Sequence, residues 1–244
     1  MALRGTVKAA LAGPLKRAFG ALDLDVRDRR RTPAHHFLGL PSRGIRTVLD
    51  VGANIGQFAQ KALAVFPDAR FLCFEPLPTA YGTLATWAAG EPRVTTFNLA
   101  LGEADGELTF HEHADHPTSS SALRTTAGHA TLAPDTVRQR ETRVPVRRLD
   151  AVLAEPGLSA GPLLLKLDVQ GYEAHVLRGA LDTLRRADSV ITEVCLDPLY
   201  DGQATFRDLY DLCTAAGLTY AGNLDQHYGP DGHVAFFDAV FVRT

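Results

Sequence analysis

The chain has few cysteines, and their spacing indicates neither a metal site nor a disulfide framework. Cys73, Cys195 and Cys213 form no C-x-x-C pair, and two of them lie inside apolar, strand-like runs. This pattern is typical of reduced, buried thiols in a cytoplasmic protein. No apolar run reaches the roughly 18 residues that a membrane-spanning helix needs. We therefore expect a cytoplasmic, globular protein.

An excess of basic residues is also missing. The net charge of −3 gives no general footprint for nucleic acid, so we expect no nucleic-acid partner. Basic residues gather only near the N-terminus, at Arg4, Lys8, Lys16 and Arg17 and in the run RDRRR at residues 27–31. Such a basic amphipathic segment more often packs on its own domain or on another subunit than on a membrane. We expect no membrane contact, and the sequence is compatible with a homo-oligomer.

Residues 47–58, TVLDVGANIGQF, carry the clearest local signal in the chain. They predict a buried strand, a tight turn at Gly52, Ala53 and Asn54, and a helix that opens at Gly56. Glycine is needed where a side chain would block a ligand or where φ must be positive, and a helix start offers unpaired N–H groups to an anion. The stretch predicts a nucleotide-type cradle, although an ordinary strand-to-helix turn needs glycine as well.

The spacing within this stretch narrows the cofactor. Asp50, Gly52, Asn54 and Gly56 follow the order D-x-G-x-N-x-G, whereas a dinucleotide fold has G-x-G-x-x-G and a P-loop has G-x-x-x-x-G-K-[ST]. The observed order resembles the first motif of class I S-adenosylmethionine-dependent methyltransferases. That resemblance implies an acidic residue at the strand end and a loop that passes under the methionine part of the cofactor.

A second carboxylate supports a nucleoside ligand. Glu75 ends the apolar run RFLCFE at residues 70–75, about 20 residues after the glycine turn, where a βαβ unit places a carboxylate against ribose hydroxyls. A surface glutamate at a strand end is the plainer alternative. Asn98 lies near the end of a third predicted strand, residues 93–101, where an amide or the backbone can read the edge of adenine.

The order of predicted elements describes one α/β domain. We expect a catalytic domain at residues 46–244, preceded by a helical, basic segment and linker at residues 1–45. In the middle of the chain a loop rich in Ser, Thr and His, residues 112–129, replaces a crossover helix, as active-site lids and binding loops often do. Further predicted elements are helices at residues 56–66, 77–89, 173–186 and 205–216 and strands at 107–111, 141–148, 163–169, 189–195 and 234–242.

Residues 166–180, KLDVQGYEAHVLRGA, repeat the opening pattern of strand, carboxylate, glycine and helix. Together with DVGANIGQF, with FEP at residues 74–76 and with the closing FDAVFVR, this motif resembles the FkbM family of S-adenosylmethionine-dependent methyltransferases over about residues 47–243. The resemblance implies S-adenosylmethionine as cofactor and O-methylation, often of sugars or polyketide-type natural products. It also implies a Rossmann-like, seven-stranded α/β sheet, mostly parallel with an antiparallel last strand and with helices on both faces.

Position 170 is Gln where many members of this family have Glu, which argues against an acid or base role for that side chain. Methyl transfer needs an acceptor oxygen aligned with the methyl group and relieved of its proton. Asp168 is our first choice beside the reacting methyl group and is also a candidate cofactor contact, and Glu193 is a second catalytic candidate, because open α/β sheets bind ligands at the carboxyl ends of their strands. A histidine is better matched to neutral pH as a base, and the candidates are His111, His113 and His116.

Other polar residues near the loop are candidates for binding the acceptor. Ser119, Ser120 and Ser121 offer hydroxyls to the acceptor or the cofactor. Glu173 is placed to bind the acceptor or, equally, to stabilise the start of its own helix. The acceptor itself, a small molecule or a glycan, has no readable code in the sequence.

A divalent metal and three other functions remain as alternatives. Asp168 and Glu193 can hold Mg²⁺ through oxygen ligands and acidify the acceptor hydroxyl, but only two carboxylates are apparent, so we predict no metal. The other functions are methylation of a nitrogen or carboxylate acceptor, a cofactor-binding module without catalysis, and an oxidoreductase. The glycine spacing disfavours the oxidoreductase.

Overall fold

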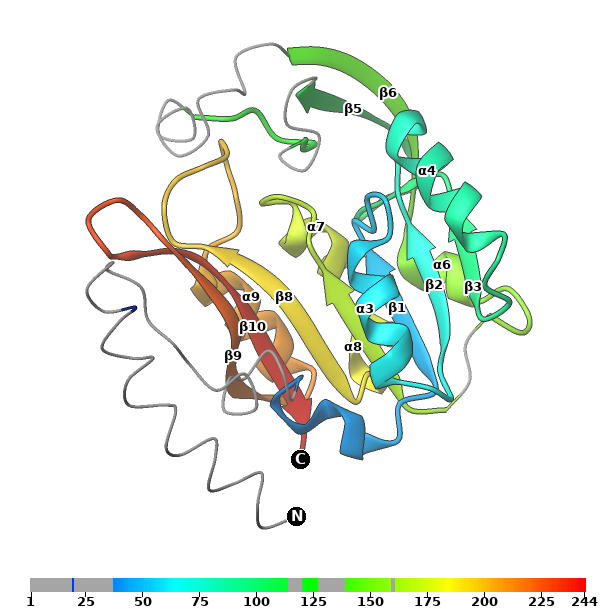
Figure 1. Cartoon of the computed structure of the whole chain (residues 1–244). Coiled ribbons are helices and arrows are strands. Elements are labelled where there is room, and N and C mark those ends of the chain that lie inside the picture. The colour runs from blue at the N-terminus through cyan, green and yellow to red at the C-terminus, as the bar shows by residue number, and fades with distance from the viewer. Residues whose placement is uncertain (1–18, 20–36, 114–119, 127–138, 159–160) are drawn as a thin grey trace.

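A computed structural model describes residues 19, 37–113, 120–126, 139–158 and 161–244 of the chain. Within these ranges a seven-stranded sheet with the order β3-β2-β1-β7-β8-β10-β9 runs through the molecule (Figure 1). Pairing is parallel from β3 to β8, whereas β10 is antiparallel to β8 and to β9. The predicted sheet is confirmed. Its strands are β1 (Thr47–Val51), β2 (Arg70–Phe74), β3 (Val94–Phe97), β7 (Leu163–Leu167), β8 (Ser189–Cys195), β9 (Leu218–Tyr228) and β10 (Val234–Arg243).

Helices cover both faces of this sheet, so successive residues of a central strand point into two separate cores. Leu49 and Val51 pack with α6, α7, α8 and α9, whereas Val48 packs with η2, α3 and α4. Strands of a parallel sheet that are covered on both sides read as continuous apolar runs, as β1 does except at Asp50. The helices are η2 (Phe37–Arg43), α3 (Gln57–Val65), α4 (Pro78–Ala88), α6 (Leu149–Leu153), α7 (Glu173–Arg178), α8 (Leu181–Arg186) and α9 (Phe206–Ala215).

The third strand is shorter than predicted, and the rest of the predicted range belongs to a second sheet. β3 ends at Phe97, and the Asn98 side-chain amide donates hydrogen bonds to the carbonyl oxygens of Glu75 (2.9 Å) and Pro76 (3.0 Å). The chain then leaves the large sheet, and β4 (Ala100–Leu101), β5 (Gly106–His113) and β6 (Gln139–Arg147) form a three-stranded sheet in the order β4-β6-β5. This small sheet packs against the start of α4 and was only partly predicted.

The helix predicted at residues 173–186 is divided into α7 and α8. A Cβ atom on Gly179, which follows α7, would lie 1.9 Å from the carbonyl oxygen of Gly102. This close approach of two backbone segments fixes the break between the helices. The long edge strand β9 was not predicted, because its sequence LTYAGNLDQHY is mostly polar and half exposed.

The predicted linker contains structure of its own. η2 lies within it and buries Leu40 against the core shared with α3 and α4, while the domain boundary at residue 46 stays a prediction. Several predicted features lie outside the described residues: residues 1–36 apart from residue 19, residues 114–119 with His116 and Ser119, and residues 127–129. In the described ranges, none of the helices has the length and apolar character that crossing a membrane requires.

Candidate functional site

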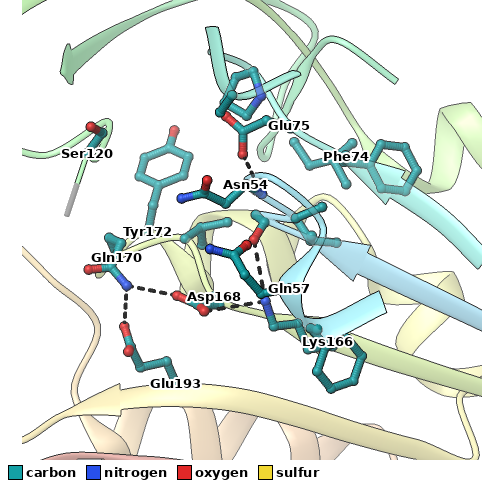
Figure 2. A pocket seen from close by; sticks show the side chains of 18 of the residues that line it. Asn54, Gln57, Phe74, Glu75, Ser120, Lys166, Asp168, Gln170, Tyr172 and Glu193 are labelled. Carbon is teal, nitrogen blue, oxygen red and sulfur yellow. Dashed lines mark hydrogen bonds and ion pairs between the residues drawn. The ribbon is translucent and has the colours of Figure 1, made fainter. Parts of the chain in front are cut away.

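A pocket of about 660 Å³ opens at the carboxyl ends of the parallel strands. The turn after β1, the end of β2, the segment after β7 and the end of β8 all contribute to it (Figure 2). The small sheet adds an apolar wall that includes Ala100, Leu101 and Phe110. This is the edge at which ligands bind in open α/β sheets, and the sequence predicted it.

The turn after β1 is held by backbone contacts that require glycine. Gly52 has φ +76°, and a Cβ atom there would lie 1.9 Å from the carbonyl oxygen of Asp168. The N–H groups of Gly52 and Ala53 donate to the carbonyl oxygen of Phe74, at 3.1 and 3.0 Å. Gly52 and Asn54 line the pocket. The turn therefore brings the ends of β1, β2 and β7 together and leaves open space in front of it.

Glu75 lies beside this turn as a buried carboxyl group with one face on the pocket. Its two oxygens accept hydrogen bonds from the backbone N–H groups of Asn54 and Leu77, each at 2.9 Å. Burial raises its pKa to about 7, against the effect of these two hydrogen bonds. A carboxyl group fixed in this way keeps lone pairs for donors such as a pair of ribose hydroxyls. The geometry fits the nucleoside role that its position in the sequence predicts.

Asp50 does not line the pocket, although its position in the motif predicted a cofactor contact. Its side chain is fully buried within β1, and the Nζ atom of Lys166 on β7 lies 3.2 Å from its Oδ1. Burial raises the pKa of Asp50, and the nearby Lys166 charge opposes that shift. The Lys166 Nζ atom also lies 3.4 Å from Asp168 Oδ2. Asp50 is therefore linked to the pocket through Lys166, which lines it.

Asp168 and Glu193 lie on the pocket wall opposite Glu75, joined by the side chain of Gln170 (Figure 2). The Gln170 amide donates to Asp168 Oδ1 at 2.8 Å and to Glu193 Oε2 at 2.9 Å. Burial, followed by the charge on Asp168, holds the pKa of Glu193 well above its usual range. Burial also raises the pKa of Asp238 on β10 to about 6. The two carboxyl groups predicted as catalytic candidates, Asp168 and Glu193, thus form one cluster with Asp238 beside it.

Three further candidates from the sequence have structural partners instead of a place at the pocket. Gly56 forms the start of α3 at φ +91° and packs against Trp87. The Asn98 side-chain amide donates to the carbonyl oxygens of Glu75 and Pro76 at the point where the chain leaves β3. Glu173 is buried, and its Oε1 accepts hydrogen bonds from the N–H groups of Val169 and Gly171, at 3.0 and 3.2 Å. The stabilising role at the helix start is therefore the one that the structure gives Glu173.

Of the serine and histidine candidates that the structure describes, His111 and His113 lie in β5, and Ser121 forms an isolated bridge to His111. Ser120 lines the pocket, whereas Ser121 is fully buried and its hydroxyl donates to the carbonyl oxygen of Gln170 at 2.6 Å. His111 pairs with Ser121 through its backbone. His113 ends β5, and its side chain lies outside what the structure describes.

Sequence reasoning missed much of one wall of the pocket. Gln170, Tyr172 and Tyr200 line it, and so do His227, Phe236 and Asp238 from the β9–β10 pair. Asp238 stands in the closing motif FDAVFVR and was a readable signal. Tyr200 and His227 lie in stretches of sequence that contain no such signal. Among the described residues, no group of three or more His, Cys, Asp or Glu side chains is arranged to hold a metal ion.

Comparisons with known proteins agree with the geometry of this pocket. Residues 50–220 match the methyltransferase FkbM domain. The chain is 31% identical over 170 residues to the 2-O-methyltransferase NoeI of Sinorhizobium fredii, which covers 68% of this chain and 70% of that protein. It is 30% identical over 216 residues to the 31-O-demethyl-FK506 methyltransferase FkbM of Streptomyces tacrolimicus, covering 77% and 78%.

A solved structure shares the fold. The crystal structure of methyltransferase FkbM from Methylobacillus flagellatus KT matches with a TM-score of 0.52 at 16% identity. The match covers 80% of this chain but only 44% of that one, so the chain spans less than half the length of that structure.

Proposed function

The chain belongs to the FkbM methyltransferase family, and we propose that it methylates a hydroxyl of a sugar, a glycan or a natural product. Its cofactor is S-adenosylmethionine. The names of two relatives specify an O-methyl position, which supports an oxygen acceptor.

The residues around the glycine turn fit the cofactor. Gly52 and Asn54 form one side of the pocket, and Glu75 presents a buried carboxyl group whose position is fixed by two backbone N–H groups. Ribose hydroxyls are donors that such a carboxylate accepts well. When bound, S-adenosylmethionine supplies an electrophilic methyl group on a positively charged sulfur.

The opposite wall of the pocket carries the argument for a hydroxyl acceptor. Glu193 and Asp238 face the pocket from β8 and β10, and His227 and Phe236 stack with ring centroids 4.3 Å apart. Carboxyl groups accept hydrogen bonds from hydroxyls, and ring faces cover the apolar C–H surface of a sugar or polyketide. A carboxylate acceptor is disfavoured, because it would meet like charges on this wall.

The carboxyl cluster can orient the acceptor and remove its proton. Asp168 is partly exposed and lies next to the glycine turn, where its free lone pairs can receive the acceptor O–H. Glu193 lies next to it with a raised pKa, which makes its ionised form a stronger base than an ordinary carboxylate. Ser120 and Ser119 stay candidate contacts of the acceptor, and His113 stays a candidate base.

An acceptor panel tests this proposal. The purified protein is incubated with S-adenosylmethionine carrying a labelled methyl group and with matched acceptors: a methyl glycoside, the corresponding amino sugar, the corresponding uronic acid and a polyketide alcohol. We expect label in an ether that resists mild base. Label found only in an amine or only in an ester would show that the acceptor is a nitrogen or a carboxylate and not a hydroxyl. Binding of S-adenosylhomocysteine without transfer to any member would favour a non-catalytic binding module.

A further inference from the structure

Gln170 occupies a position between the two carboxyl groups that uses every polar atom of its side chain. Its amide nitrogen donates one hydrogen bond to Asp168 Oδ1 and one to Glu193 Oε2, at 2.8 and 2.9 Å. Its Oε1 accepts a hydrogen bond from the Tyr200 hydroxyl. An amide nitrogen carries two hydrogens and no acceptor, so both are committed to the carboxyl groups.

The surroundings of Gln170 dictate this orientation. Turning the amide over would place its oxygen against the Asp168 carboxylate, where neither group has a hydrogen to donate. The backbone is fixed as well, since the carbonyl oxygen of Gln170 accepts from the buried Ser121 hydroxyl. Gln170 has φ +56°, a conformation that residues other than glycine adopt at a cost and that is often found at functional sites. The side chain is therefore held as a rigid bridge.

Glu193 is surrounded mainly by acidic groups. Burial raises its pKa most, and neighbouring negative charges add to this effect, while one lysine opposes it. The titratable groups that face it are Asp168 and Lys166 on or after β7, Glu173 on α7, Asp238 on β10, and Cys195 and Tyr200 at and beyond the end of β8. A carboxyl group in such surroundings favours its neutral form until a positive charge arrives.

From this arrangement we propose that Glu193 keeps a proton in the free protein and releases it when the positively charged cofactor binds, and that Gln170 is a positioning residue that joins Glu193 to Asp168 and donates to the carboxylate once it is ionised. The inference rests on the proposed function, because it concerns the same pocket. It makes Glu193 available as a base only after the methyl donor is in place. Asp168 then orients the acceptor without having to take the proton.

The proton balance has two stages. On cofactor binding, the O–H bond of Glu193 breaks and its proton passes to solvent, which leaves a carboxylate. In the transfer step, the acceptor O–H bond breaks and its proton goes to this carboxylate, while the new oxygen–carbon bond forms and the sulfur–carbon bond breaks. The neutral product S-adenosylhomocysteine leaves Glu193 protonated, as it is in the free protein.

A titration of the free protein tests the role of Gln170 without any acceptor. The side-chain carboxyl carbons of glutamate are labelled with ¹³C, and the Glu193 signal is identified by its absence in Glu193→Gln. We expect it to titrate well above the ~4.3 of an exposed glutamate, because Glu193 is buried among negative charges. Gln170→Glu places a third carboxyl group in the cluster and is expected to raise this midpoint by more than about one pH unit.

Two variants separate this effect from general damage. Gln170→Asn keeps the amide and suits a positive φ, but it is too short to bridge both carboxyl groups, so we expect the Glu193 midpoint to rise because a donor to its ionised form is lost. Gln60→Glu adds the same charge on an exposed part of α3 and leaves the midpoint in place. An ordinary Glu193 midpoint, or one that neither Gln170 variant moves, would overturn the proposal.

Calorimetry tests the release of the proton. Binding of S-adenosylmethionine and of S-adenosylhomocysteine is measured at pH 7 in buffers with different ionisation enthalpies, which gives the number of protons released. We expect more release with the cationic ligand, by at most about one proton, and no difference in Glu193→Gln. Equal release in the wild type, or a difference that survives in this variant, contradicts the proposal. If neither ligand binds, the proposed function fails, and the titration of the free protein still decides the role of Gln170.

Discussion

The buried pair of Asp50 and Lys166 gives the sharpest prediction about stability. Replacing Lys166 with Met keeps a side chain of similar length in β7 but removes the charge whose Nζ atom lies 3.2 Å from Asp50 Oδ1. The Asp50 carboxyl group is fully buried and would lose its cationic partner. Removing one member of a buried ion pair costs about 3–5 kcal/mol, because the other charge stays behind without compensation.

The double variant distinguishes this cause from lost packing. Lys166→Met combined with Asp50→Asn removes both charges, so it is expected to recover most of the loss, since a buried ion pair is often no more stable than a neutral replacement. At roughly 2–4 °C per kcal/mol for a domain of this size, Lys166→Met alone should lower Tm by roughly 6–20 °C. Urea unfolding of the wild type, both single variants and the double variant completes the cycle.

The pH dependence of the single variant adds a second check. The pKa of Asp50 is already raised by burial in the wild type, and loss of Lys166 raises it further. A carboxyl group whose pKa is raised on folding costs stability once pH passes its unfolded value, and the cost grows until pH passes the folded pKa. The wild type and the variant lose stability equally until pH passes the folded pKa of Asp50 in the wild type, so the deficit of Lys166→Met relative to the wild type should grow only above that pKa. A loss below about 1 kcal/mol at pH 8, or a double variant as unstable as the single one, would refute the reasoning.

Three further predictions concern the pocket. Gly52→Ala should lower the free energy of unfolding by at least about 2 kcal/mol and abolish binding of S-adenosylhomocysteine, because its Cβ would meet the backbone of Asp168. The control is Gly82→Ala in α4, where a Cβ meets nothing. Denaturation should show this control to be as stable as the wild type or more stable. Glu75→Gln should weaken S-adenosylhomocysteine at least about tenfold in calorimetry, and it should gain stability relative to the wild type between pH 4.5 and about 7, where the wild type ionises a buried carboxyl group. Asp168→Ala should lower turnover at least about tenfold with cofactor affinity held; equal loss of both would make Asp168 a cofactor contact.

Local patterns predicted the fold well, because the signals that define it are short. The run TVLDVGANIGQF contains its own strand, turn and helix start, and the structure places β1, the Gly52 turn and α3 there. The same holds for the carboxyl ends of β2, β7 and β8, where Glu75, Asp168 and Glu193 reach one pocket.

Residues whose role depends on a distant partner were not predictable in this way. Asp50 looked like a cofactor ligand, and only the parallel register of β1 and β7 shows that Lys166 is its Cα neighbour. Asn98 looked like part of a strand, but its amide finds two carbonyl groups that end the strand. Gln170 is held in place by Glu193 and by Tyr200, which lies thirty residues further along the chain. These contacts are tertiary, so the propensities of single segments do not predict them.

The central claim is that the pocket in front of Gly52 and Glu75 holds S-adenosylmethionine, and ligand-dependent thermal stability tests it most directly. The melting temperature is measured with S-adenosylmethionine, S-adenosylhomocysteine and NAD, each with and without a chelator, for the wild type and Glu75→Gln. At about 100 times its Kd a ligand stabilises by roughly 2.7 kcal/mol, a shift of several degrees. The account predicts this shift for the two sulfur ligands alone, unchanged by chelator and reduced in Glu75→Gln. A shift with NAD, or none with either sulfur ligand, would contradict it.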